Sequence, residues 1–310
     1  MIVNVEGLVK RYDKLVALDY LDLKVEEGEI FGLLGPNGSG KTTAINCILS
    51  LLRYDKGTIE IFGKTMNPNA YDLKRNIGII MQNVAVFDEL TVYENISYFC
   101  SLYVKDNAEV KRLTKEAIDF VSLEEFRNFY PKKLSGGLLR RLNIACGIVH
   151  KPKLIILDEP TVAVDPQSRN KILEGIKKLN EEGATVIYTS HYMEEVEQLC
   201  SRIAIIDKGR VIAQGTKEEL KSMISIGEKI TMETFNIREE QISELRRLPN
   251  IYSVEYRDNM LEIKSGRGKN NLVAVLDYMA KNAISFGKVI TELPTLNDVF
   301  LEITGKELRD

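Results

Sequence analysis

Hydrophobic and polar residues alternate along the first part of the chain, in the pattern that predicts β-strands. The stretches MIVNVEGLVKRY and LVALDYLDLKVEEGEIFGLLG are strand-like and are broken by turn residues. From Thr42 to Leu52 the apolar residues recur at helical spacing, and the stretch GTIEIFGK returns to a strand pattern. From Leu90 to about Val149 the pattern is mainly helical. The amino-terminal half therefore mixes strands with helices.

The stretch PKLIILDEP has an apolar run that ends in two carboxylates, as expected of a strand that is buried on both faces. The stretches ATVIYTSH and RIAIIDKGRVIAQGT repeat the strand pattern, with a helix between them. Strands that alternate with helices predict a mostly parallel sheet covered on both sides. We therefore expect an α/β domain over residues 1–222, with a helical subdomain at about 88–150.

The pattern changes character near residues 222–227. It then predicts a strand, a helix, a hairpin, a helix and a strand, at residues 229–235, 238–248, 251–265, 270–282 and 285–291. This β-α-β-β-α-β order predicts a small ferredoxin-like α+β domain over residues 223–310. Thr295 and Asp298 stand at capping-box spacing and predict the start of a last helix. The second domain has no catalytic motif, so we interpret it as an accessory or regulatory unit.

Composition narrows the class of protein. A length of 310 residues favours two domains, and the net charge of −3 argues against broad nucleic-acid binding. The four cysteines are far apart, which is typical of reduced thiols and disfavours a disulfide framework or a zinc site: Cys47, Cys100, Cys146 and Cys200. No signal-peptide pattern and no long apolar run stands out, so we expect no membrane span of the chain's own.

A glycine-rich motif carries the clearest chemistry. The stretch GPNGSGKT fits the phosphate-binding pattern G-x-x-x-x-G-K-[ST] and lies between an expected strand and an expected helix. Its backbone N–H groups and Lys41 would hold phosphates, and the Thr42 hydroxyl would bind Mg²⁺. The alternative is a chance glycine-rich turn. The candidate ATP-binding residues are Gly35, Pro36, Asn37, Gly38, Ser39, Gly40, Lys41, Thr42 and Thr43.

Two carboxylates follow the buried strand LIILDEP. Asp158 is placed to hold Mg²⁺ through its hydration shell, and Glu159 stands beside it. A carboxylate next to a terminal phosphate can accept a proton from attacking water, which is worth roughly 10²–10⁴-fold in rate. Two solvated acids at a strand end are the alternative.

Three further polar residues stand at or near the ends of apolar stretches. His191 directly follows the strand ATVIYTS, where open parallel sheets bind their ligands, although a lone histidine is usually structural. Gln82 ends the stretch NIGIIMQ and could coordinate Mg²⁺ or water. Tyr12 could stack on a base, although exposed tyrosines are common.

A second phosphate-binding pattern lies in the stretch KKLSGGLLRRLNIA. Ser135, Gly136 and Gly137 precede a basic and apolar helix, and helix N-termini of this kind bind phosphate. The order of the motifs (P-loop, Gln82, LSGG, LIILDEP, Asp165, His191) resembles the ATP-binding cassette (ABC) ATPases over residues 1 to about 220. The resemblance implies a P-loop NTPase fold, with a RecA-like core and antiparallel β and helical subdomains.

The resemblance also implies how the residues divide between two chains. Ser135, Gly136 and Gly137 of one subunit would cap the ATP held by the partner, and Asp165 would lie in the loop that crosses the interface. The facing chain would supply its P-loop together with Mg²⁺ ligands (Thr42, Gln82 and Asp158), catalytic residues (Glu159, His191 and Gln82), and an adenine contact from Tyr12 supported by Val16. ATP and Mg²⁺ are the implied cofactors.

Two positions depart from the usual motifs. Leu138 stands where the family pattern has glutamine, and Ala163 replaces a residue that is often glycine. An apolar residue followed by two arginines is similar to a bacterial exporter branch that includes daunorubicin-type drug exporters and lipid, polysaccharide and bacteriocin-immunity systems. The segment EPTVAVDPQSR and the tail LPTLNDVFLEITGKELRD resemble that branch as well.

As a member of this branch, the chain would be the motor of an exporter. It would pair with a second ATPase subunit, identical or related, and would work on separate permease subunits at the inner face of the cell membrane. Residues 83–99 are the candidate permease contact, although their apolar side chains could be core. One alternative function is a soluble cassette ATPase that remodels ribosomes or DNA. Another possibility is that the second domain senses a ligand and throttles the motor.

Overall fold

The computed structural model describes residues 1–235, 237–268 and 271–305 of the chain. They form two compact units, residues 1–216 and the described residues of 217–305. The expected boundary, between residues 222 and 223, lies at the C-terminal end of helix α8 (Lys217–Ser222), which belongs to the second unit. Residue 270, in an expected helix, and residues 306–310 of the exporter-like tail lie outside the described residues.

A six-stranded sheet forms the centre of the first unit. Its strand order is β10-β9-β3-β8-β7-β6, and only the β10–β9 pair is antiparallel. Every residue of β3, β7 and β8 is buried, as expected of parallel strands covered on both faces. The strand bounds are Ile77–Ile80 (β6), Leu154–Asp158 (β7), Thr185–Ser190 (β8), Ile30–Leu34 (β3), Arg202–Asp207 (β9) and Arg210–Thr216 (β10).

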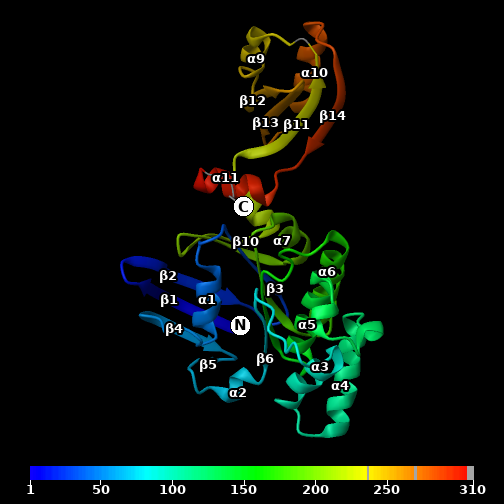
Figure 1. The fold of residues 1–310 in the computed structure, drawn as a ribbon. Helices are drawn as coiled ribbons and strands as arrows, with labels where there is room; N and C mark the ends of the chain where they lie inside the picture. Colours follow the sequence, from blue (N-terminus) through cyan, green and yellow to red (C-terminus); the bar gives the residue numbers. More distant parts are fainter. Residues whose placement is uncertain (236, 269–270, 306–310) are drawn as a thin grey trace. The chain divides into compact units, whose positions relative to one another are not determined.

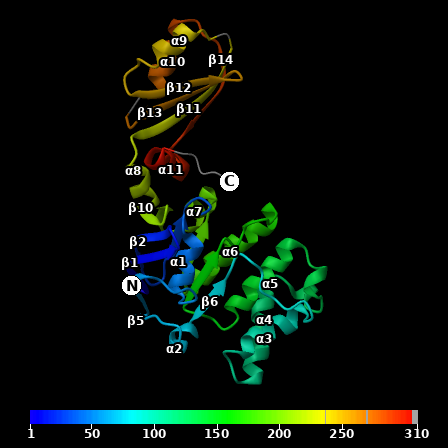
Figure 2. The ribbon, with the colours of Figure 1, turned by 60° about the vertical axis from the view of Figure 1, so that its left-hand side comes forward.

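A second, antiparallel sheet of the first unit has the order β2-β1-β4-β5. Helix α1 (Lys41–Ile48) contacts strands of both sheets (Figure 2). Its Ile45 and Ile48 are fully buried in one shared apolar cluster. The strands alternate between buried and exposed positions, which explains their legible sequence pattern. Their bounds are Val3–Tyr12 (β1), Leu15–Val25 (β2), Lys56–Ile61 (β4) and Lys64–Thr65 (β5).

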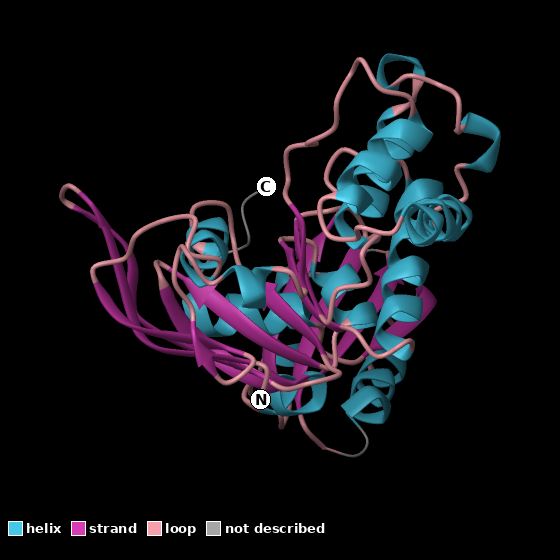
Figure 3. Ribbon diagram, turned by 90° about the horizontal axis from the view of Figure 1, so that it is seen from below, coloured by secondary structure: helices cyan, strands magenta, loops and turns pink. Residues whose placement is uncertain are grey.

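Helix α5 packs against β6, and α3 and α4 pack against α5 and against each other (Figure 1). Figure 3 shows the helices and the sheets of the chain from below. Helix α3 begins after a capping box in which Thr91 and Glu94 satisfy each other's backbone N–H groups. Helix α5 begins after Ser135, whose hydroxyl accepts from the backbone N–H of Leu138. The helices of the first unit other than α1 are α2 (Tyr71–Lys74), α3 (Val92–Ser101), α4 (Asn107–Phe120), α5 (Gly136–Ile148), α6 (Pro166–Glu181) and α7 (Met193–Leu199), with 3₁₀ turns at Glu124–Phe126 and Pro131–Lys133.

The second unit follows the order β-α-β-β-α-β between two short helices. Its sheet has the order β12-β13-β11-β14, and every neighbouring pair is antiparallel. Ile230, Leu261, Val275 and Met279 are fully buried between the sheet and its helices. The elements are β11 (Ile226–Thr234), α9 (Glu239–Leu245), β12 (Ile251–Arg257), β13 (Met260–Gly266), α10 (Asn271–Lys281), β14 (Phe286–Glu292) and α11 (Leu296–Thr304).

The last helix, α11, starts as its sequence predicts. The Thr295 side chain accepts from the backbone N–H of Asp298, and the Asp298 carboxylate accepts from the backbone N–H of Thr295. The four cysteines of the chain are buried, and none of them forms a disulfide within the described residues. Within the described residues, no helix combines the length and the apolar character needed to span a bilayer.

Candidate nucleotide site

Four neighbouring parallel strands bring the candidate residues to one edge of the central sheet. The P-loop follows β3, His191 follows β8, Glu159 follows β7, and Gln82 lies just beyond β6. Because the carboxyl ends of parallel strands share an edge, residues far apart in sequence meet there. A cavity of about 500 Å³ opens at this edge. Its lining residues are Tyr12, Leu15, Val16, Ala17, Asn37, Gly38, Gly40, Lys41, Thr42, Thr43, Gln82, Glu159 and Lys208.

The P-loop reaches its tight shape through glycine. Gly40 has φ +111° and caps α1, and a Cβ there would approach the Ala17 carbonyl oxygen to 2.8 Å. Only glycine fits such a left-handed turn against a neighbouring backbone. The loop therefore points the N-terminus of α1, with its unpaired N–H groups, at the cavity.

Lys41 is buried under this loop. Its ammonium group donates to the Gly35 carbonyl oxygen at 2.8 Å and to that of Pro36 at 3.3 Å. The same group lies 3.3 Å from Oε1 of Glu159, and the Lys41 side chain is only 4% exposed. A buried cation in contact with a carboxylate is an ion pair that an anionic ligand can enter.

Glu159 is the centre of the polar cluster. Its Oε2 accepts from the Gln82 side-chain amide at 3.1 Å, and its Oε1 lies 3.4 Å from Nδ1 of His191. The residue has φ +49°, an unfavourable left-handed conformation for a side chain with a Cβ. Its backbone N–H donates to Oγ1 of Thr189 at 3.0 Å, which holds this turn in place. Strain of this kind is typical of functional sites.

Asp158 is fully buried next to Glu159. Its Oδ1 accepts from the Thr189 hydroxyl at 2.6 Å, whereas its Oδ2 has no hydrogen-bond partner. A buried carboxylate oxygen without a partner is costly unless a cation or water completes it. Magnesium binds through one or two carboxylates together with hydroxyls, waters and phosphates. Asp158, the exposed Thr42 and Gln82 therefore fit a Mg²⁺ site.

Tyr12 and Val16 stand at the open side of the cavity. Both are exposed, at 45% and 39%, and lie at the turn between β1 and β2. The ammonium group of Lys10 lies 5.0 Å from the Tyr12 ring centroid. An exposed aromatic ring at the mouth of an anion-binding cavity is able to stack on a base.

The second phosphate-binding motif is not part of this cavity. Ser135 and Gly136 are exposed at the N-terminus of α5, and Gly137 packs against the segment that begins α6. A Cβ on Gly137 would come within 2.8 Å of the Ser168 Cβ and 3.0 Å of Asp165 Oδ2. The motif and the Asp165 segment therefore lie side by side in one chain.

Asp165 caps helix α6. Its Oδ1 accepts from the backbone N–H of Ser168 at 2.9 Å, and this bond lowers the pKa of the Asp165 carboxyl. Ala163, two residues earlier, has φ +58°, which explains why glycine suits this position. The Leu138 backbone makes the capping bond to Ser135, so this contact does not need a glutamine side chain.

Sequence reasoning missed several residues that hold the site. The Thr189 hydroxyl donates to the Asp158 carboxylate and accepts from the backbone N–H of Glu159. Arg140 of α5 donates to the carbonyl oxygens of Met81 and Gln82 at 3.1 and 2.7 Å. Lys208 also lines the cavity. A polar residue at the end of a buried strand would have been a signal for Thr189. The contacts of Arg140 and Lys208 leave no local signal.

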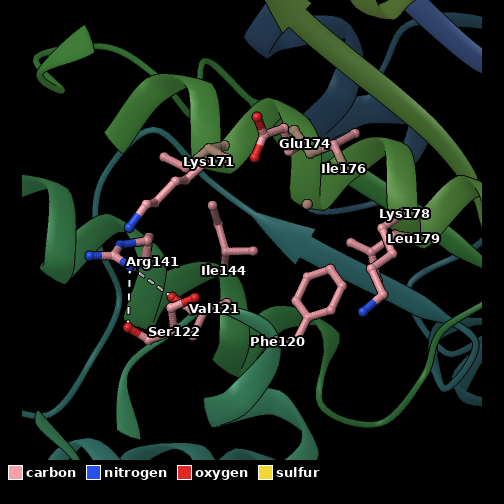
Figure 4. A pocket seen from close by; sticks show the side chains of 12 residues that line it. Phe120, Val121, Ser122, Arg141, Ile144, Lys171, Glu174, Ile176, Lys178 and Leu179 are labelled. Carbon is pink, nitrogen blue, oxygen red and sulfur yellow. Dashed lines mark hydrogen bonds between the residues drawn. The ribbon is translucent and has the colours of Figure 1, made fainter. Parts of the chain in front are cut away.

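A different pocket, of about 270 Å³, lies between the end of α4 and helices α5 and α6 (Figure 4). Arg141 crosses it and donates to the carbonyl oxygens of Val121 and Ser122 at 2.9 and 3.3 Å. The Phe120 ring lies against Gly175. The two bonds of Arg141 join α5 to the turn that follows α4. None of the predicted site residues lines this pocket.

Comparison with known proteins identifies the family. Residues 18–162 match the ABC transporter family. Over 307 residues the chain is 39% identical to the linearmycin resistance ATP-binding protein LnrL of Bacillus subtilis (strain 168), which covers 98% of this chain and 99% of that protein. The chain belongs to the ABC transporter family. It is the ATP-hydrolysing, nucleotide-binding subunit of an ABC transporter of the drug-exporter branch.

Two further similarities locate the chain within the ABC family. The daunorubicin/doxorubicin resistance ATP-binding protein DrrA of Streptomyces peucetius is 42% identical over 222 residues, 72% of this chain and 67% of that protein. A dimeric post-hydrolysis state of the ATP-binding cassette MJ0796, bound to ADP and Pi, superposes with a TM-score of 0.64. It is 29% identical and covers 69% of this chain and 98% of that chain. The P-loop ABC fold is therefore shown for the first unit.

Proposed function

We propose that the chain works as one of two motors in an exporter, with ATP bound between the motors. Ser135, Gly136 and Gly137 would cap the nucleotide held by the partner's P-loop. The observation that carries this proposal is the division of the phosphate-binding groups. One set surrounds the cavity beside Glu159, whereas the exposed N-terminus of α5 does not line that cavity. A head-to-tail pair would use both sets twice.

Within each site, Lys41 and the P-loop N–H groups would hold the β- and γ-phosphates, and Gly35 to Thr43 would form the cradle. Thr42, Gln82 and Asp158 would hold Mg²⁺, which supplies charge stabilisation to the phosphates when bound. Support comes from the partnerless Oδ2 of the buried Asp158. Tyr12 would stack on the adenine ring, with Val16 packed beside it.

Glu159 would act as the general base. Its contacts with Lys41, Gln82 and His191 support this role, because a phosphate that takes Lys41 would free the carboxylate to face water. His191 and Gln82 would then position the terminal phosphate and the attacking water. Asp165 would lie at the interface between the two motors, close to Gly137 at the start of helix α5.

The permease contact is proposed for residues 83–99. Phe87 packs against Tyr98 and Phe99, with ring centroids 5.1 and 6.0 Å apart, yet Phe87 and Tyr98 remain 43% and 44% exposed. Exposed aromatic clusters are typical of protein interfaces. A permease bound here would hold the motor at the inner face of the cell membrane and would select the cargo.

For the second unit we propose a ferredoxin-like accessory domain. Its β-α-β-β-α-β order and its sheet order, β12-β13-β11-β14, support this fold. The domain has a separate apolar core and would modulate the motor rather than take part in hydrolysis. Removal of residues from 225 onward would test this role, because unchanged ATPase activity and transport would leave the domain only a structural one.

Fractionation of the tagged chain from its native cells tests the motor assignment. We expect the chain in the membrane fraction, with a polytopic partner that co-purifies in stoichiometric amount in mild detergent. A matched sample with Phe87→Ser and Tyr98→Ser should lose the partner and keep ATP hydrolysis. A soluble chain that co-purifies with ribosomes or DNA would contradict the proposal and favour a remodelling ATPase.

A further inference from the structure

Glu195 of α7 is a buried carboxylate outside the nucleotide cavity. It is 4% exposed, and its Oε2 accepts from the hydroxyls of Thr161 and Tyr188, both at 2.7 Å, and of Ser190 at 3.2 Å. Thr161 follows Glu159 by two residues, and Ser190 directly precedes His191. One carboxylate oxygen thus joins the segment that follows β7 to the C-terminal end of β8. A buried charge is retained only where such bonds compensate its lost hydration.

The other oxygen of this carboxylate faces a cation. Oε1 of Glu195 lies 3.2 Å from Nε of Arg169 in helix α6, and α6 packs against α7 (Figure 1). The Arg169 guanidinium also stands 4.9 Å above the Tyr192 ring, and that ring lies 4.1 Å from the His191 imidazole, centroid to centroid. Arg169 therefore contacts the turn that carries His191 directly, through the Tyr192 ring, and indirectly, through Glu195 and its bond to Ser190.

Arg169 is tied to the Asp165 segment as well. Its backbone N–H donates to the Asp165 carbonyl oxygen at 2.9 Å, in the first turn of α6. A displacement of Asp165 must therefore move Arg169. Because the guanidinium bridges to a carboxylate that is itself fixed by three hydroxyls, the His191 turn must follow or the ion pair must break.

We propose that Arg169 is a positioning residue that couples the Asp165 segment to His191 through Glu195 and Tyr192. The inference rests on the proposed function, in which Asp165 lies at the interface with the partner motor. The partner's arrival would then set the position of His191 beside Glu159. Each motor would hydrolyse its nucleotide only when the other is docked.

A second ion pair of the same unit provides a matched control. Nη1 of Arg202 lies 3.0 Å from Oε1 of Glu29, and the two side chains are 29% and 11% exposed. The corresponding exposures of Arg169 and Glu195 are 32% and 4%. Glu29 precedes β3 and Arg202 begins β9, so this pair stands at the opposite edge of the sheet from the P-loop. If each ion pair only stabilised the fold, replacing its arginine should have the same effect on stability and on activity in both pairs.

The experiment compares Arg169→Met with Arg202→Met in the full chain. ATPase activity of the wild type is measured first, since its absence would refute the proposed function and not the coupling. For Arg169→Met we expect kcat to fall at least tenfold, with the affinity for MgATP within twofold of wild type. Arg202→Met should lower the thermal midpoint by a similar amount and keep kcat within twofold.

Two more variants complete the test. Glu195→Gln keeps an acceptor for the hydroxyls but removes the charge that Arg169 faces, so it should reproduce the kcat loss even if Arg169→Met does not fold. Arg169→Lys should restore part of kcat. Wild-type kcat in both Arg169→Met and Glu195→Gln, or equal losses of kcat in Arg169→Met and Arg202→Met, would overturn the proposal. A loss of MgATP affinity that accounts for the lost activity would overturn it too.

Discussion

Lys41 and Glu159 are far apart in the sequence, yet Nζ of Lys41 and Oε1 of Glu159 lie only 3.3 Å apart. The ammonium group is also bonded to the Gly35 carbonyl oxygen, so the P-loop folds over its own lysine. This pair links the residue proposed to bind phosphate to the residue proposed to activate water. Binding of a phosphate would transfer the lysine from one anion to another and leave Glu159 for catalysis.

Replacement of Lys41 by methionine should weaken MgATP binding. A hydrogen bond to a charged group contributes about 1.5–3 kcal/mol, so the affinity should fall roughly 10- to 100-fold. Isothermal titration calorimetry with MgATP measures this loss. Lys64→Met is the control, because Lys64 pairs with the exposed Asp72 away from the cavity. Unchanged affinity in Lys41→Met would contradict the P-loop assignment.

The candidate residues of the nucleotide site could be predicted from the sequence because each lies at the end of an apolar strand or in the segment after it. The carboxyl ends of parallel strands share one edge of the sheet, so Lys41, Asp158, Glu159 and His191 could be grouped without a structure. The supporting residues could not. Arg169, Arg140 and Thr189 act through contacts that depend on how α6, α5 and β8 pack, and a surface arginine and a buried one look alike in sequence.

The second unit was predictable for a similar reason. Helix α10 keeps its buried apolar residues at helical spacing, and the Thr295–Asp298 capping box marks a helix start locally. The boundary between the two units has no local marker in the sequence, since α8 follows β10 without a break and no proline or glycine run separates the units. The β12–β13 hairpin was expected from the sequence, whereas the pairing of β11 with β13 and β14 becomes apparent only in three dimensions.

Ala163 has a backbone conformation that favours glycine. Its φ of +58° is unfavourable for a residue with a Cβ, so Ala163→Gly should stabilise the first unit by about 1 kcal/mol. Ala108, an exposed residue in the first turn of helix α4, is the opposite case, and Ala108→Gly should cost up to about 1 kcal/mol. Urea unfolding of both variants gives the two signs. A destabilised Ala163→Gly would show that the turn is not strained.

Gly137 and Gly136 are neighbours with different surroundings. A Cβ on Gly137 would meet the Ser168 Cβ at 2.8 Å, whereas a Cβ on Gly136 would find its nearest neighbour 3.9 Å away. Overpacking typically costs about 1–3 kcal/mol, so Gly137→Ala should lower the thermal midpoint of the nucleotide-free chain by several degrees. Gly136→Ala should leave it near wild type. Equal midpoints would mean that the Asp165 segment yields easily.

His150 should make stability depend on pH. Burial lowers its pKa to about 4, although the Ile77 carbonyl oxygen accepts from its ring, and the Tyr103 ring stacks on it at 3.8 Å. A folded pKa below the unfolded value of about 6.5 means that the unfolded chain binds more protons between these two values. The contribution of the neutral His150 side chain to the free energy of unfolding is therefore complete above pH 6.5 and is lost as the pH falls towards 4.

Thermal unfolding at pH 7.5 and at pH 5 measures this effect in the wild type and in His150→Gln. The variant removes the titrating group, so its midpoint should fall less between the two pH values than that of the wild type. A loss on the order of 2 kcal/mol at pH 5 is expected in the wild type. An identical pH dependence of the two proteins would assign the effect to other groups.

Dimerisation of Glu159→Gln with ATP tests the central claim most directly. The change keeps the size of the side chain but removes the proposed base, so ATP should stay bound and hold two chains together. Size-exclusion chromatography with light scattering should show a dimer with MgATP and a monomer without it, and the ATPase rate should fall by about 10²-fold or more. A monomer in MgATP, or hydrolysis at the wild-type rate, would contradict the account.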